Sequence, residues 1–299
     1  MSLKIRKPDG KKVKCCVSDI QGALNAQARA LQMLDNEETF GTLLRSYFQV
    51  ERLALETSLR RQLNSSIEIR QSHEITASFN FVMCAVLFAA RGYVDKTRAS
   101  LSRNFIELPE ILASFDTSRK SEHSKHLSFR FFEALRNYAQ HVGTPVTGYT
   151  IFTCPSAEGQ WTSCGITVDR SDILDQEEFR KVRTEVSKMT GHIQLIPMLR
   201  EYISAFARVQ AKLRESLEQT HQDVRGAMFK VFIAANELGD ELTVIEVDDA
   251  GRVSKHSFLA LSPLHRISRL IAENENSSLG SLRVRTQAPL NVPKGMANV

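Results

Sequence analysis

Three polar side chains near the end of one predicted helix are the best suited to chemistry in this chain. Arg136, Asn137 and His141 lie in the stretch 131–143, with four residues between the arginine and the histidine. Histidine transfers protons near neutral pH, and a guanidinium is permanently charged and can bind two phosphate oxygens at once. These residue types suit cleavage of a phosphodiester without a metal ion.

The spacing by itself is not specific. Arg119 with His126, and Arg214 with His221, are each separated by six residues. In both of these pairs a charged residue follows the arginine. The arginine of the stretch 131–143 is instead followed by a small polar residue and has aromatic neighbours, and its histidine lies just before a glycine. Those additions make this stretch the most specific one in the sequence.

The stretch 131–143 resembles the signature of the HEPN superfamily, helical bundles that often act as metal-independent endoribonucleases. That signature is an arginine, commonly followed by Asn, Asp or His, and a histidine after four to six intervening residues; Arg136, Asn137 and His141 occupy those places. The stretch Ala89–Asp95 is similar to the long helix that precedes the motif in such domains. The resemblance covers residues 19–143. It implies an RNA substrate, a homodimer whose two motifs meet in one cleft, and a toxin–antitoxin or antiphage setting with an antitoxin or regulatory protein as partner.

Helical geometry places the three motif residues unevenly. At about 100° per residue, Asn137 and His141 share a flank about 40° wide, whereas Arg136 is about 140° from His141. The arginine and the histidine therefore converge only with help. Either the long arginine curls toward the helix end, or a second copy of the helix faces the first.

The resemblance and the chemistry assign a role to each candidate residue. Cleavage by attack of the ribose 2′-hydroxyl needs a proton donor for the leaving oxygen, and the helix dipole favours a cation at the helix end that carries His141. Arg136 would stabilise the charge on the phosphate, and Asn137 would orient the imidazole or a phosphate oxygen. Asp95 could hold Arg136 in place across the bundle, and Arg130 could contact RNA phosphate.

Each of these residues also has an explanation without function. His141 could cap helix carbonyls, and Arg136 could pair with Glu133. Asp95 could pair with an arginine on its own helix, Arg91 or Arg98. Arg130 could simply be solvated.

The elements that must position the motif are helices. Apolar residues recur at spacings of three and four, which is typical of helices with one buried face, over Asp19–Leu34, Glu37–Leu63, Phe79–Leu101 and Ser128–Val142. Gly143 suits the position after the last helix, and Pro145 prevents its continuation. His123 and His126 fall in a polar linker before that helix. Short polar links between the helices predict an antiparallel helical bundle.

The pattern changes after Pro145. Gly148–Thr153 with Trp161–Val168, and Leu242–Val247 with Val253–Phe258, alternate like strands and predict two hairpins. Helices are predicted over Asp172–Met189 and Ile193–Thr220, and the tail from Asn274 is expected to be partly irregular. We therefore expect a mainly α chain: a basic arm over 1–17, a HEPN-like bundle over 18–145, and an α+β region with two hairpins over 146–299.

Most of the net charge of +5 comes from the N-terminus, where the first fourteen residues hold six cationic side chains against Asp9. Such an arm is typical of a solvated tail, but it can also attract a phosphate backbone over about a Debye length. The rest of the chain is close to neutral.

The remaining sequence features argue for a soluble intracellular protein. The five cysteines are odd in number and form no C-x-x-C, so neither zinc nor a disulfide framework is indicated, and adjacent Cys15 and Cys16 are interpreted as incidental. The apolar run Phe79–Ala90 is shorter than the ~20 residues of a membrane helix, and no secretory signal is recognisable. We expect a cytoplasmic location, no membrane partner, and no metal or other cofactor.

Three functions remain open. The first is a HEPN-type endoribonuclease acting on RNA. The second is a non-catalytic helical interaction or regulatory module. The third is nucleic-acid binding led by the basic arm.

Overall fold

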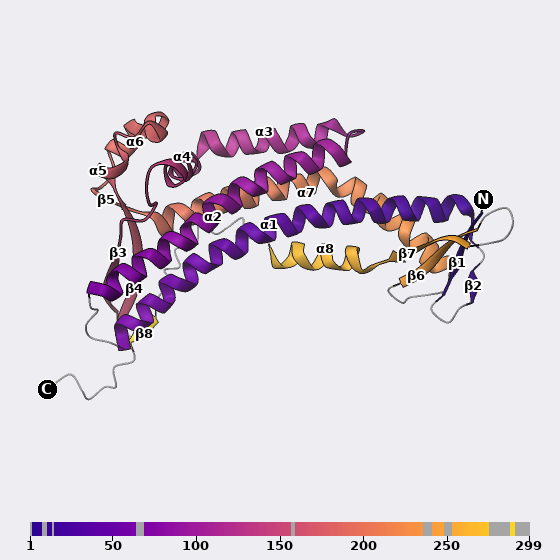
Figure 1. The fold of residues 1–299 in the computed structure, drawn as a ribbon, viewed down its shortest axis with the longest axis horizontal. Helices are drawn as coiled ribbons and strands as arrows, with labels where there is room; N and C mark the ends of the chain where they lie inside the picture. Colours follow the sequence, from indigo (N-terminus) through magenta and orange to yellow (C-terminus); the bar gives the residue numbers. More distant parts are fainter. Residues whose placement is uncertain are drawn as a thin grey trace. The chain divides into compact units, whose positions relative to one another are not determined.

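The computed structural model describes residues 2–7, 11–13, 15–63, 69–156, 159–235, 241–247, 253–274 and 288–290 (Figure 1). The chain divides into two compact units, each built from separate stretches. Unit 1 comprises Met1–Gly41, Asp95–Phe115 and Ala211–Glu275, and unit 2 comprises Thr42–Val94, Asp116–Gln210 and Asn276–Val299. The three sequence domains, with their boundary near Pro145, remain predictions.

Long helices supply most of the chain (Figure 1): α1 Val17–Leu63, α2 Ile69–Asn104, α3 Pro109–Lys125, α4 Leu127–His141 and α7 Leu195–Ala234. The two helices expected over residues 19–63 are one continuous helix. Their polar junction is buried, and Glu37 there accepts hydrogen bonds of 2.8 and 2.7 Å from the guanidinium of Arg214. A buried ion pair, and not a loop, accounts for the polar residues in the middle of α1.

Helix α3 lies where the sequence predicted a linker, so that expectation is wrong. The helix begins at Pro109, which suits the first helical position because it has no N–H to satisfy. It buries Ile111 and Phe115, and its last turn holds His123. His126, the next histidine, is the residue immediately before α4.

The sheet of unit 1 has the strand order β2-β1-β6-β7, formed by β1 Ser2–Arg6, β2 Lys12–Val13, β6 Glu241–Val247 and β7 Val253–Ala260. Strand β1 pairs antiparallel with β6, with Ile5 opposite Val244. Ile5 is fully buried, whereas Lys4 and Arg6 on either side of it are exposed. The interpretation of the basic arm as a solvated tail is therefore wrong for these strands.

The core of unit 1 lies where this sheet meets the helices. Its buried members include Ile20, Ala23, Val231, Phe232, Leu242, Leu259 and Leu264. Helix α8, Ser262–Glu273, adds the last of these residues and has Pro263 in its first turn. Burial of such side chains contributes about 1.5–3 kcal/mol each. The predicted hairpin over 242–258 is confirmed as β6 and β7.

The adjacent thiols at the start of α1 have opposite pKa shifts. Hydrogen bonds from Ser18 lower the pKa of the exposed Cys16 thiol, whereas burial and the charge of Asp19 raise the pKa of Cys15. We expect iodoacetamide to modify Cys16 several times faster than Cys15 at mildly alkaline pH, because the thiolate is the nucleophile. Burial raises the pKa of Cys164 to about 12, so this thiol should stay unmodified. Peptide mass spectrometry over time measures the order, and faster modification of Cys15 would contradict it.

The sheet of unit 2 is formed by β3 Gly148–Ser156, β4 Gly159–Asp169, β5 His192–Gln194 and β8 Ala288–Leu290. Strand β4 pairs with each of the other three, all antiparallel. The predicted hairpin over 148–168 is confirmed. The tail after Asn274 lies outside the described residues, except for β8.

The helix predicted over 172–189 is wrong as one element. The structure has three short segments there: α5 Arg170–Ile173, η1 Glu177–Val182 and α6 Arg183–Ser187. Ile173 and Phe179 are both fully buried. On one helix, six residues would place them about 120° apart. Breaking the helix lets both side chains reach the core.

The mainly α fold with a C-terminal α+β region and two hairpins is confirmed. One point refines it: the second hairpin, β6 and β7, shares its sheet with the two N-terminal strands β1 and β2.

Helix α2 is unusually apolar. Within the described residues, Gln71–Asn104 is long and apolar enough to cross a membrane, with 28% of its most apolar window buried. Core helices of soluble proteins pass the same test, so the absence of a membrane and the cytoplasmic location stay predictions.

Candidate functional site

An aromatic cluster in unit 2 holds α4, the helix that carries the sequence motif. Phe129 and Phe132 are fully buried against α7, with ring centroids 4.8 Å from Phe206 and 5.1 Å from Tyr202 respectively. Phe131 and Tyr138 contact Phe179 of η1. Offset and edge-on aromatic contacts of this kind contribute about 0.5–1.5 kcal/mol beyond area burial. These contacts hold the helix that carries the motif in place within unit 2.

A polar network fixes the N-terminal end of α4. The ring of His126 has Nδ1 2.9 Å from Glu201 Oε1 and Nε2 3.2 Å from Glu122 Oε2. Arg208 donates to the same Glu122 oxygen from Nε and Nη2 at 2.9 and 2.7 Å. Glu122 is only 9% exposed. This network was not predictable from the sequence, because its members are contributed by α3, α7 and the residue before α4.

The backbone at the C-terminal end of α4 forms hydrogen bonds to Tyr138. The backbone N–H groups of Val142 and Gly143 both donate to the carbonyl of Tyr138, at 2.8 and 3.1 Å. The tyrosine side chain also crosses the glycine, because a Cβ added at Gly143 would lie 2.5 Å from Tyr138 Oη. A side chain at position 143 would therefore clash with the Tyr138 ring, which accounts for a glycine at the end of this helix.

We expect Gly143→Ala to lower the free energy of unfolding by about 1–3 kcal/mol, because the new methyl group forces the Tyr138 ring to move. Chemical denaturation measures the change. Gly92→Ala within α2 is the matched control: its Cβ meets nothing within 4 Å, so it should be neutral or stabilise by about 0.5–1 kcal/mol. Equal effects of the two substitutions would contradict the proposed clash.

The three motif residues lie in the last two turns of this helix, where Arg136 and Asn137 are half-buried and His141 is exposed. Arg136 Nη2 donates to Asn137 Oδ1 at 2.5 Å. His141 is the last residue of α4, is exposed, and forms no hydrogen bond or ion pair within the described chain. Its ring does not cap the helix carbonyls. A guanidinium, an amide and an imidazole thus line one helix end.

The surroundings of Arg136 leave part of its donor capacity unused. Glu133, the expected ion-pair partner, lies 3.0 Å from His123 instead, and no ion pair of Arg136 is found among the described residues. The Nε of Arg136 is buried without a hydrogen-bond partner, and an unmet buried donor costs about 1–3 kcal/mol. Burial raises the pKa of Tyr202, and the charges of Glu133 and Arg136 act on it in opposite directions. The positive charge is therefore close to the aromatic core.

The other two candidate residues are engaged elsewhere. Arg130 donates to the carbonyls of His123 and Ser124 at 3.2 and 2.8 Å and pairs with Glu185 at 3.1 Å. These bonds tie the end of α3 to α6, so an RNA phosphate would have to share this guanidinium. Asp95 is exposed on α2, in the part assigned to unit 1, and takes part in an interaction of its own. The structure therefore joins Arg136 and Asn137 by a hydrogen bond, while the roles of all five candidate residues stay predictions.

Comparison with known proteins gives no match. No family model matches the chain, and neither a curated protein nor a solved structure is similar to it. The resemblance to the HEPN superfamily therefore stays a prediction from the sequence.

Proposed function

We propose that the protein is a metal-independent endoribonuclease of the HEPN type. The observation that carries the proposal is the hydrogen bond from Arg136 to Asn137, four residues before the exposed His141 on the same helix. The unmet buried Nε of Arg136 also supports a binding role.

The proposed reaction uses these groups in one displacement at phosphorus. The ribose 2′-oxygen forms a bond to phosphorus as the bond to the 5′-oxygen breaks, and the 2′-hydroxyl proton passes to water. His141 gives its proton to the departing 5′-oxygen. Arg136 binds the phosphate oxygens that gain charge, and Asn137 fixes the guanidinium. The products are a 2′,3′-cyclic phosphate and a 5′-hydroxyl.

The homodimer belongs to the same proposal. Two motifs facing each other would place a second guanidinium and imidazole on the RNA. The toxin–antitoxin or antiphage setting, with an antitoxin or regulatory protein as partner, follows from the resemblance alone. Light scattering of the purified protein tests the dimer.

RNA cleavage in EDTA tests the activity directly. We expect the wild type to cut RNA in EDTA, and Arg136→Lys to lose most of this activity because lysine keeps the charge but not the paired donors. Arg180→Lys is the control, since Arg180 is exposed and pairs only with Glu177 among the described residues. A wild type without activity, or an unchanged Arg136→Lys variant, would contradict the proposal.

A non-catalytic interaction module is the second candidate, and one observation favours it. Phe48, Leu55 and Leu59 are 41–47% exposed on α1, at spacings of seven and four that place them on one face. An exposed apolar row is typical of a surface that binds another protein. This candidate predicts no RNA cleavage by the purified wild type, so the EDTA assay separates the two functions.

A further inference from the structure

A cleft in unit 2 lies between the start of β3 and the helices α1 and α2. One side chain fixes its geometry: Asn80 of α2 donates from Nδ2 to the carbonyl of Val146 and accepts the N–H of the same residue, both at 2.8 Å. This pair of bonds holds the chain just before β3 against α2. Residues 72, 73 and 76 lie one to two turns before Asn80, so α2 overhangs the beginning of the strand.

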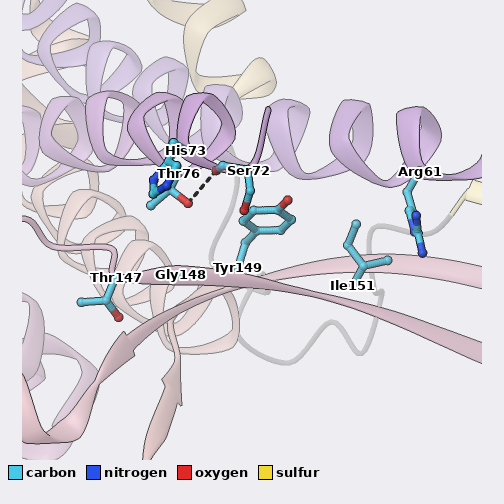
Figure 2. A pocket seen from close by; sticks show the side chains of 8 residues that line it. All are labelled: Arg61, Ser72, His73, Thr76, Thr147, Gly148, Tyr149 and Ile151. Atoms are coloured by element: carbon cyan, nitrogen blue, oxygen red, sulfur yellow. Dashed lines mark hydrogen bonds between the residues drawn. The ribbon is translucent and has the colours of Figure 1, made fainter. Parts of the chain in front are cut away.

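The cleft has a volume of about 510 Å³, within the range of about 300–1,000 Å³ typical of small-molecule sites. Figure 2 shows Tyr149 pointing from β3 toward α2, with His73 and Thr76 nearby on the helix and Arg61 pointing from α1 toward the strands. Its described lining residues are Arg61, Ser72, His73, Thr76, Thr147, Gly148, Tyr149 and Ile151. None of these is acidic, and two carry nitrogen donors on their side chains. The lining therefore favours an anion.

The hydroxyl groups of the cleft differ in how much hydrogen-bonding capacity remains for a ligand. Thr76 donates to the carbonyl of Ser72 at 3.0 Å, and Thr147 accepts the N–H of Asp169 at 2.9 Å, so both serve the fold. The side chains of Ser72, His73 and Tyr149 form no hydrogen bond within the described chain. All three line the hollow, and Figure 2 shows Ser72 beside the Tyr149 ring.

Arg61 supplies the permanent charge. It is exposed and takes part in another interaction of the chain, but its five N–H donors allow a ligand to share it. Planar guanidinium groups bind phosphate in pairs of hydrogen bonds. The ring of Tyr149 adds an apolar face on which a base can stack, which contributes about 1–3 kcal/mol per base.

From this lining we infer that the cleft is a nucleotide-binding site, which takes a phosphate on Arg61 and a base on Tyr149. The nucleotide is either free or part of an RNA strand. The RNA source rests on the proposed function: His141 and Gly148 are seven positions apart in the chain, so the two lie within about 25 Å of each other, a distance that one RNA strand can span.

Binding to the full chain tests this inference with two probes, AMP by calorimetry and a fluorescein-labelled 2′-O-methyl RNA by anisotropy. The RNA lacks the free 2′-hydroxyl, so cleavage does not interfere. We expect Arg61→Gln and Tyr149→Leu each to weaken binding at least about tenfold, because each removes about 1.4 kcal/mol or more. Tyr149→Phe should keep most of the affinity, which separates stacking from the hydroxyl.

Arg60→Gln is the matched control for charge, since it removes the same charge from the next residue, which lines a different hollow between α1 and α2. It should change affinity less than about twofold. If AMP binds and the variants weaken its binding as expected, the ligand is a free nucleotide. If only the RNA probe binds in this way, the ligand is an RNA strand. No binding of either probe, or an equal loss in Arg60→Gln, overturns the inference. His141→Ala should still bind both probes, because the cleft does not include His141. A wild type that binds the probes but cleaves no RNA would contradict the proposed function only.

Discussion

Replacing His141 with alanine is expected to slow RNA cleavage about 10²–10⁴-fold, the usual contribution of one positioned proton donor. The physical reason is the position of the ring: it is exposed at the end of α4 and has no hydrogen-bond partner in the described structure. Its loss should therefore leave the fold intact. Single-turnover cleavage of a labelled RNA in EDTA measures the rate, and thermal unfolding confirms that the variant is folded.

The neighbouring residue provides the control for this substitution. Gln140 is exposed one position before His141 on the same helix, so Gln140→Ala changes the same surface without removing an imidazole. It should cleave at the wild-type rate within about threefold, which is under 1 kcal/mol. Full activity in His141→Ala, or an equal loss in both variants, would show that the imidazole has no part in the chemistry.

Replacing Glu122 with alanine is expected to cost about 1.5–3 kcal/mol of unfolding free energy, because it removes the acceptor of two hydrogen bonds from the partly exposed Arg208. Glu122 accepts two hydrogen bonds from Arg208, and His126 lies 3.2 Å from it. Its side chain is 11% exposed, whereas Glu215, which pairs with Lys212, is 65% exposed. Chemical denaturation should show a change below about 1 kcal/mol for Glu215→Ala.

A double variant separates two quantities: the net contribution of the ion pair to stability, and the loss of stability when only one partner is removed. Glu122→Leu with Arg208→Leu should lose less stability than Glu122→Ala alone, because it leaves no uncompensated charge of this pair in the interior. The double variant should also keep RNA cleavage at low temperature, since Arg136 and His141 are untouched. A loss in Glu122→Ala no larger than that in Glu215→Ala would contradict a structural role for the network.

The sequence was most informative where one element determines its own conformation. The apolar stripe of α4, its stop at Gly143 and the two hairpins follow from spacing and turn residues, and all of them are present. The flank shared by Asn137 and His141 follows from helical geometry. Only the direction of the Arg136 guanidinium required the structure, because a long side chain can turn to either flank.

Features built from distant parts of the chain were not predictable. The sequence pattern predicts that His126 lies in a linker, but its partner Glu201 is 75 positions away. Strand β1 reads as a charged tail, yet it pairs with β6. The cleft on α2 depends on the bond between Asn80 and Val146, 66 positions apart. In each case the residue types alone do not specify the partner.

The chemical identity of the RNA ends tests most directly whether a guanidinium and an imidazole on one helix end act together on a phosphodiester. Mass spectrometry of products formed in EDTA should find 2′,3′-cyclic phosphate and 5′-hydroxyl ends, in amounts that fall together in Arg136→Lys and His141→Ala. Products with 3′-hydroxyl and 5′-phosphate ends, or cleavage that survives both substitutions, would contradict 2′-hydroxyl attack at this site.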